Sequence, residues 1–154
     1  MIRQAAIQFR RVSAEDVAAV VAIEANVDEP KTYGRPLTLQ AALTEIERAA
    51  YYLVMKGGQS IGTAAFEFRS DGAAYLSNIA LLPGYRNQGF GREVVAFLLS
   101  QCVSAPRIEL VTHPENLVAL SLYRSFGFTV GGRSDNHFGD GEPRLILSRD
   151  NSKL

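Results

Sequence analysis

The sequence contains no tryptophan, one cysteine and two histidines among its 154 residues, and its formal net charge is zero. The single thiol, Cys102, cannot form an internal disulfide, and so few thiolate and imidazole ligands argue against a zinc site. The balanced charge provides no basic field of the kind that attracts nucleic acid. We therefore expect no metal ion and no nucleic-acid partner.

Long apolar runs are also missing, although 47% of the residues are hydrophobic. No segment reaches the roughly 20 apolar residues that a membrane-spanning helix needs, and the N-terminal segment 1–11 has no signal-peptide core. The composition is that of an ordinary globular protein, and the length fits one domain. We expect a single domain over residues 1–154, located in the cytoplasm, without a membrane partner.

Helical and strand periodicity alternate along the first half of the chain. A short strand is predicted at 6–11, followed by two helices. Ser13 and Asp16 form a capping box at the start of the first helix, and the second has an apolar stripe over 39–50. Two prolines and a glycine between them indicate a loop at 26–36. Three consecutive antiparallel strands are then expected, at 52–55, 60–69 and 73–82.

The second half alternates strands with helices. An amphipathic helix follows the third of those strands, with Val94, Val95, Leu98, Leu99 and Cys102 on one face. The remaining expected elements are a strand at 107–112, a helix at 116–126 and strands at 128–132 and 144–148. The whole pattern predicts an α/β (α+β) fold in which helices cover both faces of a mixed central sheet.

The segment from Asn78 to Arg92 carries the clearest chemical signal, because a buried strand runs into a glycine-bearing loop that opens a helix. Backbone N–H groups at a helix N-terminus attract anions, and Gly89 and Gly91 allow a phosphate to approach the backbone closely. Arg86 and Arg92 flank the loop and can add charged hydrogen bonds. An ordinary structural turn between a strand and a helix is the alternative.

Two other phosphate-binding motifs do not fit this loop. A Walker loop requires lysine and then serine or threonine after its last glycine, whereas Arg92 and Glu93 follow Gly91. A dinucleotide fingerprint requires a third glycine or alanine at the position of Val94.

The pattern Arg86-x-x-Gly89-x-Gly91, after a strand that ends in Ala80-Leu81-x-Pro83, resembles the pyrophosphate motif of the GNAT superfamily of N-acetyltransferases. A second signature of that family is matched in the segment Asn116–Phe128, which has Tyr123 seven residues after its asparagine and then Gly127-Phe128. The two motifs stand in the right order and spacing. The resemblance covers roughly residues 52–148.

The resemblance implies an acetyl-CoA-dependent transferase that acetylates an amine by direct attack. It assigns Tyr123 as the proton donor to the departing thiolate, since a phenol is protonated at neutral pH; packing in the core is the competing interpretation. It also implies a set of cofactor contacts: Ile79, Ala80 and Leu81 for the pantetheine arm, Arg86, Asn87, Gln88, Gly89, Phe90, Gly91 and Arg92 for the pyrophosphate, and Asn116, which can equally be a plain helix cap.

The general base and the acceptor are left open. The family's base positions lack a carboxylate here, at 74–77 and at Val111, so the candidates are Glu67, Glu109, His113 or ordered water. Acceptor specificity is expected in the loops 26–36 and 133–143, through Asp28, Glu29, Tyr33 and Phe138.

Among acceptors, the primary amine of a small molecule or amino acid is favoured. The alternatives are a peptide or protein N-terminus, because the segment 132–141 is similar to the tail of ribosomal-protein N-terminal acetyltransferases, or a non-catalytic acyl-CoA-binding module. Many members of the family pair as homodimers, so a homodimer is a further implication of the resemblance.

Overall fold

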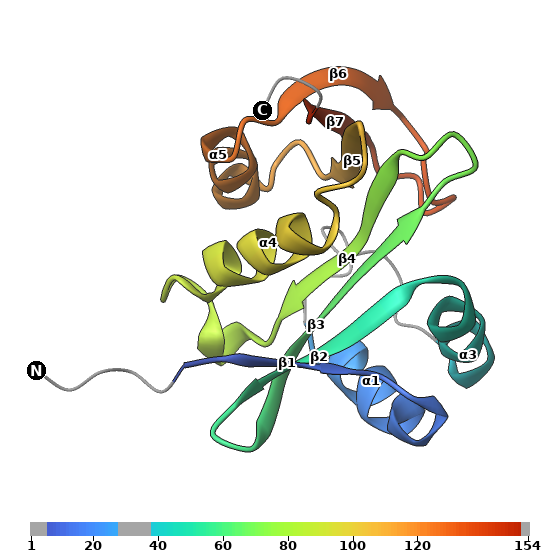
Figure 1. Cartoon of the computed structure of the whole chain (residues 1–154), viewed down its shortest axis with the longest axis vertical. Helices are drawn as coiled ribbons and strands as arrows, with labels where there is room; N and C mark the ends of the chain where they lie inside the picture. Colours follow the sequence, from blue (N-terminus) through green and yellow to red (C-terminus); the bar gives the residue numbers. More distant parts are fainter. Residues whose placement is uncertain (1–5, 28–37, 152–154) are drawn as a thin grey trace, which may run out of the picture.

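The computed structural model describes residues 6–27 and 38–151, which form a seven-stranded sheet with helices on both faces (Figure 1). The strand order is β1-β2-β3-β4-β5-β7-β6. The strands are β1 Gln8–Arg11, β2 Ala50–Lys56, β3 Gln59–Phe68, β4 Ala74–Leu81, β5 Arg107–Thr112, β6 Thr129–Ser134 and β7 Arg144–Asp150. The helices are α1 Val17–Ala25, α3 Leu39–Arg48, α4 Phe90–Gln101 and α5 Leu117–Ser125, with short 3₁₀ turns at Ala14–Asp16 and Pro83–Tyr85.

The predicted succession of elements is confirmed, including the three consecutive antiparallel strands β2, β3 and β4. The differences lie at element ends: β1 begins at Gln8 rather than at residue 6, and β7 continues to Asp150. Within the described residues, no helix is long and apolar enough to cross a membrane.

The helix starts follow from local side-chain chemistry. The Asp16 carboxylate accepts a hydrogen bond from the Ser13 backbone N–H at 3.1 Å, as the capping-box pattern predicts. Thr38 caps α3 by accepting from the Ala41 N–H at 3.1 Å. The predicted apolar stripe of α3 is only partly buried, because Leu39 is 58% exposed.

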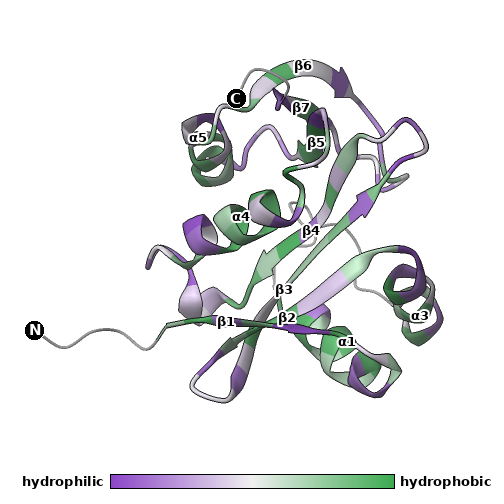
Figure 2. Ribbon diagram, viewed as in Figure 1, coloured by the Kyte–Doolittle hydropathy of each residue, from purple (hydrophilic) through white to green (hydrophobic). Residues whose placement is uncertain are grey.

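The sheet separates two hydrophobic clusters. Helix α1 packs on one face against β2 and β3, where the buried residues are Val12, Val20, Ile23, Ala49, Tyr51, Leu53 and Ala65. Helices α4 and α5 cover the other face over a larger cluster that includes Val94, Val95, Leu98, Leu110, Phe128 and Leu147. Figure 2 shows the hydrophobic stretches of α1, α4 and α5 that supply these clusters.

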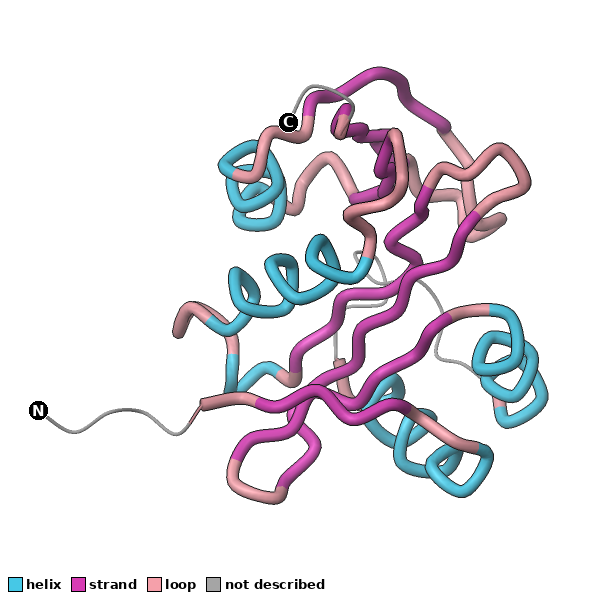
Figure 3. The backbone as a smooth tube through the Cα atoms, viewed as in Figure 1, coloured by secondary structure: helices cyan, strands magenta, loops and turns pink. Residues whose placement is uncertain are grey.

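Strands β4 and β5 are the one parallel pair of the described sheet, and they are joined at one end only. Their register contains two pairs, Ala74 with Ile108 and Tyr75 with Glu109, although β4 continues to Leu81. The β3–β4 register also skips Ser77, so β4 carries a bulge just where it leaves β5. A bulge bends its strand and increases the twist, and the two strands consequently diverge (Figure 3).

Candidate active site

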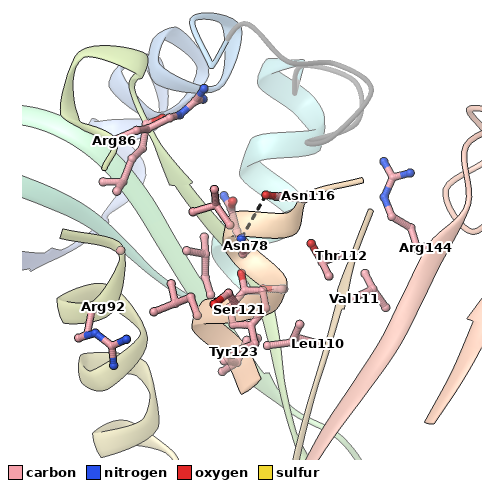
Figure 4. A pocket seen from close by; sticks show the side chains of 18 of the residues that line it. Asn78, Arg86, Arg92, Leu110, Val111, Thr112, Asn116, Ser121, Tyr123 and Arg144 are labelled. Carbon is pink, nitrogen blue, oxygen red and sulfur yellow. Dashed lines mark hydrogen bonds between the residues drawn. The ribbon is translucent and has the colours of Figure 1, made fainter. Parts of the chain in front are cut away.

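A cavity of about 530 Å³ opens where β4 and β5 part (Figure 4). Its walls come from β4, the loop before α4, β5, α5 and the start of β7. The cavity therefore lies at the same place as the two sequence motifs, which are far apart along the chain. Of the predicted site residues, those that line it are Ile79, Leu81, Arg86, Asn87, Gly89, Gly91, Arg92, Asn116 and Tyr123.

The β4 wall offers backbone groups rather than reactive side chains. Beyond Tyr75, the edge of β4 that faces β5 has no partner strand in the described sheet. An unpaired strand edge can take an extended ligand that carries its own amide groups. The Ser77 hydroxyl is buried beside this edge and has no hydrogen-bond partner among the described residues. A buried hydroxyl of this kind is expected to bond to a ligand or to water.

The loop before α4 has the backbone conformation of an anion site. Asn87 and Gly89 both adopt left-handed φ angles, of 60° and 87°, and Gly89 is the N-cap of the twelve-residue helix α4. A Cβ added at Gly89 would meet no atom within 4 Å, so the loop surface is open at that point. First-turn N–H groups and the helix dipole favour an anion there.

The two arginines of the motif are held by contacts within the protein. Arg86 donates from Nε to the Leu81 carbonyl at 3.0 Å and from Nη2 to the Val27 carbonyl at 2.7 Å, which ties the ends of β4 and α1 together. Arg92 donates to the Ser125 hydroxyl at 3.1 Å. Both line the cavity, so both positive charges are fixed beside the loop.

Three predicted cofactor contacts have side chains outside the cavity lining. Ala80 is 2% exposed, and Phe90 is 2% exposed and packs in the core. The Gln88 side chain donates to the Gly84 carbonyl at 2.8 Å. The burial of Ala80 and Phe90 leaves only their backbone groups for a ligand.

Helix α5 contributes Asn116 and Tyr123. The Asn116 side chain accepts from the Ala119 N–H at 3.2 Å, so it caps α5 while it lines the cavity. Tyr123 is 7% exposed and packs edge-on against Phe128, with ring centroids 6.1 Å apart. It also lines the cavity, as does the β5 residue Leu110 (Figure 4). Each of the two interpretations of these residues, structural and functional, is compatible with this geometry.

The structure places none of the three side-chain base candidates in the cavity lining. Glu67 pairs with Arg48 at 3.1 Å, and Glu109 pairs with Arg69 at 2.6 Å. His113 is 2% exposed, and its Nδ1 accepts from the backbone N–H of Glu115 at 3.0 Å.

A carboxylate that sequence reasoning did not single out contacts Asn78, which lines the cavity. Glu24 of α1 accepts hydrogen bonds through Oε1 from Thr63 of β3 at 2.7 Å, from Asn78 of β4 at 2.6 Å and from Tyr51 of β2 at 3.1 Å. Burial, with the Glu24 charge second, raises the pKa of the Tyr51 phenol far above its usual value. We call these four residues the Glu24 cluster. The only sequence signal for it is a glutamate on the apolar stripe of α1.

The opposite wall of the cavity comes from the last hairpin. Phe138 is 55% exposed and lies over the guanidinium of Arg144, which is 1% exposed and paired with Asp140 at 3.2 Å. A hydrogen bond from the Glu142 N–H, together with Arg144, holds the pKa of Asp140 below its usual range. Phe138 lines the cavity as expected of an acceptor loop, whereas Asp28, Glu29 and Tyr33 lie outside the described residues.

Comparisons with known proteins identify the family of the chain. The model of the acetyltransferase (GNAT) family matches residues 20–128. A Bacillus subtilis (strain 168) protein, provisionally named ribosomal protein bS18-alanine N-acetyltransferase, is 31% identical over 144 residues, which are 90% of this chain and 91% of the relative.

Solved structures show the same fold. The crystal structure of the ribosomal-protein-S18-alanine N-acetyltransferase from Escherichia coli superposes with a TM-score of 0.80 at 22% identity, over 96% of this chain and 95% of that one. The ribosomal L7/L12 α-N-protein acetyltransferase RimL, in complex with coenzyme A, has a TM-score of 0.77 at 14% identity, over 95% of each chain.

The chain belongs to the GNAT family of acetyltransferases. It is thus an N-acetyltransferase of a family whose members use acetyl-CoA as the acetyl donor.

Proposed function

We propose that this enzyme transfers the acetyl group of acetyl-CoA to the α-amino group of a protein N-terminus, with ribosomal protein bS18 as the first acceptor to test. The observation that carries the choice of acceptor is the 31% identity, over nine tenths of both chains, to the Bacillus subtilis protein. This favours the peptide alternative over the small-molecule acceptor that the sequence alone favours. The chain is proposed to act as one domain over residues 1–154.

The residues present fit a coenzyme A ester. Acetyl-CoA supplies an activated acetyl group on a pantetheine arm that carries amides. The unpaired edge of β4 at Ile79–Leu81 would hydrogen-bond to these amides like an added strand, and a β4 backbone N–H would polarise the thioester carbonyl. The backbone of the loop Arg86–Arg92 would bind the pyrophosphate at the start of α4, where two fixed arginines add positive charge.

Tyr123 is proposed as the general acid. It projects from α5 into the wall that faces the β4 edge and is protonated at neutral pH, so it can protonate the departing thiolate. The α-amine must lose a proton before or during attack, because its ordinary pKa of about 8 leaves most of it protonated at neutral pH. With the predicted side-chain bases outside the cavity lining, we assign that proton to ordered water.

The experiment is an acetylation assay with a matched set of amines. The acceptors are a peptide with the N-terminal sequence of bS18, the same peptide blocked at its α-amine with its lysines free, and a mixture of free amino acids and small amines. Acetyl-CoA consumption and the mass and position of the acetyl group on the peptide are both measured.

We expect acetylation of the free peptide at its α-amine and none of the blocked peptide. Preferential acetylation of small amines would refute the proposed acceptor and restore the small-molecule alternative. Coenzyme A binding without transfer to any amine would instead identify a non-catalytic acyl-CoA-binding module.

A further inference from the structure

The Glu24 cluster has a feature that packing alone does not require. One oxygen, Oε1 of Glu24, accepts hydrogen bonds from donors on three successive strands, β2, β3 and β4. The donors Tyr51 and Thr63 are almost completely buried, at 2% and 0% exposure. The fourth member, Asn78, is different because it also lines the cavity. The cluster therefore connects the helix α1 side of the sheet to the wall on which we place the acetyl donor.

The chemistry of the cluster fixes which way the Asn78 amide points. A carboxylate can only accept, so the amide nitrogen must face Glu24. Nδ2 indeed donates to Glu24 at 2.6 Å and to the Thr63 hydroxyl at 3.1 Å, and it also contacts the Tyr51 hydroxyl. In the described part of the chain, Oδ1 accepts no hydrogen bond, and it is not among the buried unsatisfied atoms. Asn78 thus presents a fixed carbonyl oxygen to whatever occupies the cavity.

We propose that Asn78 Oδ1 accepts a hydrogen bond from the attacking amine, and that Glu24 is a positioning residue that holds the Asn78 amide in that orientation. The inference rests on the proposed transfer to an amine. The proposed pyrophosphate loop follows the end of β4 at Leu81, so a pantetheine arm along Ile79–Leu81 would have its acetyl end at Ile79. Asn78 immediately precedes Ile79, so an amine bound to Oδ1 would lie beside the thioester.

The reaction itself explains why a hydrogen-bond acceptor at this position would raise the rate. The neutral amine nitrogen forms a bond to the acetyl carbon, and the carbon–sulfur bond breaks. The nitrogen gives up one proton to water, the thiolate receives one from Tyr123, and water returns a proton to the Tyr123 phenolate. Positive charge develops on the nitrogen during attack, which makes its N–H a stronger donor in the transition state than in the free amine. The hydrogen bond to the neutral Asn78 carbonyl oxygen therefore becomes stronger in the transition state, although this oxygen does not take the proton.

A different role for Glu24, as the base itself, is disfavoured by its contacts. Glu24 does not line the cavity, and the oxygen nearest β4 already accepts three hydrogen bonds. The two roles differ in what a glutamine would do at this position. A glutamine keeps a carbonyl oxygen for the three donors but cannot take a proton.

The first test compares Asn78→Ala with the control Asn151→Ala. Asn151 also donates from a half-buried amide, to the carbonyls of Cys102 and Ala105, and lies outside the cavity lining. We expect Asn78→Ala to lower kcat/KM for the acceptor by about tenfold or more, the range for a hydrogen bond to a charging group, with an unchanged Kd for coenzyme A. Asn151→Ala should change kcat/KM by less than about twofold while it lowers the thermal stability. Equal kcat/KM losses in the two variants would overturn the proposal.

The second test compares Glu24→Gln with Glu24→Leu. If Glu24 positions Asn78, the glutamine variant keeps most of the activity with an unchanged pH profile, and the leucine variant loses about as much as Asn78→Ala. If both variants are equally inactive, Glu24 acts as the base and the positioning role is wrong.

In both tests, the kcat/KM of each variant is compared with that of the wild type on the amine that the wild-type enzyme acetylates best. A preference for small amines would therefore refute the protein N-terminus as acceptor while the Asn78 comparison still stands. A preference for the peptide with unchanged activity in Asn78→Ala would refute the role of Asn78 and leave the proposed function intact.

Discussion

The substitution Gly62→Ala, which adds a single methyl group, tests whether the β4 wall of the cavity holds the acetyl donor. Gly62 lies on β3 opposite Leu81 of β4. A Cβ built at Gly62 would lie 2.3 Å from the backbone oxygen of Ala80 and 2.9 Å from Cδ2 of Leu81. Ordinary contact begins at 3.4 Å, so Gly62→Ala forces the two strands apart by about 1 Å. Because the nearest atom is backbone, no side-chain rotation can relieve the clash.

The displaced backbone is the part of β4 that we assign to the pantetheine arm. A shift of about 1 Å in a group that positions a substrate can cost about 100-fold in rate. Overpacking of this kind also costs about 1–3 kcal/mol of stability. We therefore expect Gly62→Ala to fold, with a lower melting temperature, and to lose about 100-fold in kcat/KM for acetyl-CoA.

Three quantities are measured: the affinity for coenzyme A by calorimetry, the rate of acetyl transfer at saturating acceptor, and the free energy of unfolding by urea denaturation. Gly131→Ala is the matched control, because Gly131 also belongs to a strand of the sheet and an added Cβ there meets nothing within 4 Å. The control should retain wild-type affinity and stability. A Gly62→Ala variant that binds coenzyme A as tightly as the wild type would show that this stretch of β4 does not hold the donor.

Three further predictions concern other parts of the molecule. Tyr123→Phe should lower kcat by about 100-fold across the pH profile and leave the Kd for coenzyme A unchanged, since it removes only a proton donor; an unchanged kcat would exclude Tyr123 as the acid. Burial raises the pKa of the Cys102 thiol to about 11, so a thiol reagent at pH 7.5 should modify the protein only after denaturation, and rapid modification of the native protein would contradict its burial. Asp140→Ala leaves the Arg144 guanidinium buried without its carboxylate and should cost about 1–3 kcal/mol in urea denaturation at pH 7. Because folding lowers the pKa of Asp140 below 3.8, this stabilisation is present above that pH and disappears as the pH falls through the lowered value, so the stability difference between the wild type and the variant should shrink as the pH falls below 3.8.

The sequence predicts the features of this site that are local in the chain. The left-handed φ of Gly89 and the start of α4 follow from the glycine loop, and the cap formed by Asn116 follows from its place before an apolar helix. Element type and order follow likewise from periodicity, because each helix or strand shows its buried face within a dozen residues. Element ends are less well predicted, since they depend on pairing with neighbours: β1 loses residues 6 and 7 because its register with β2 covers only Gln8 to Arg11.

The features that the sequence does not predict depend on contacts between distant residues. The parting of β4 from β5 is a matter of register between strands about 30 residues apart, and nothing in either strand alone indicates it. Arg86 looks like a phosphate ligand in the motif, yet its side chain also ties the Leu81 and Val27 carbonyls together. Gly91 is different: a Cβ there would make only ordinary contact, at 3.4 Å, with the Leu122 side chain, so helix packing does not require a glycine at this position.

The cavity combines several features that each cost stability and that together make a binding site. Strand β4 gives up most of its pairing with β5, Asn87 adopts a left-handed φ of 60°, and the Ser77 hydroxyl is buried without a partner in the described chain. Neighbouring pairs on both sides keep their pairing along the strands: β2 pairs with β3, and β5 with β7, over the whole lengths of β2 and β5. Because such costs persist only where the surrounding structure holds them in place, their concentration around one strand is itself an argument that this strand holds a ligand. The Glu24 cluster fits the same argument, since three polar side chains, those of Glu24, Tyr51 and Thr63, fix the single amide of Asn78 at the edge of that cavity.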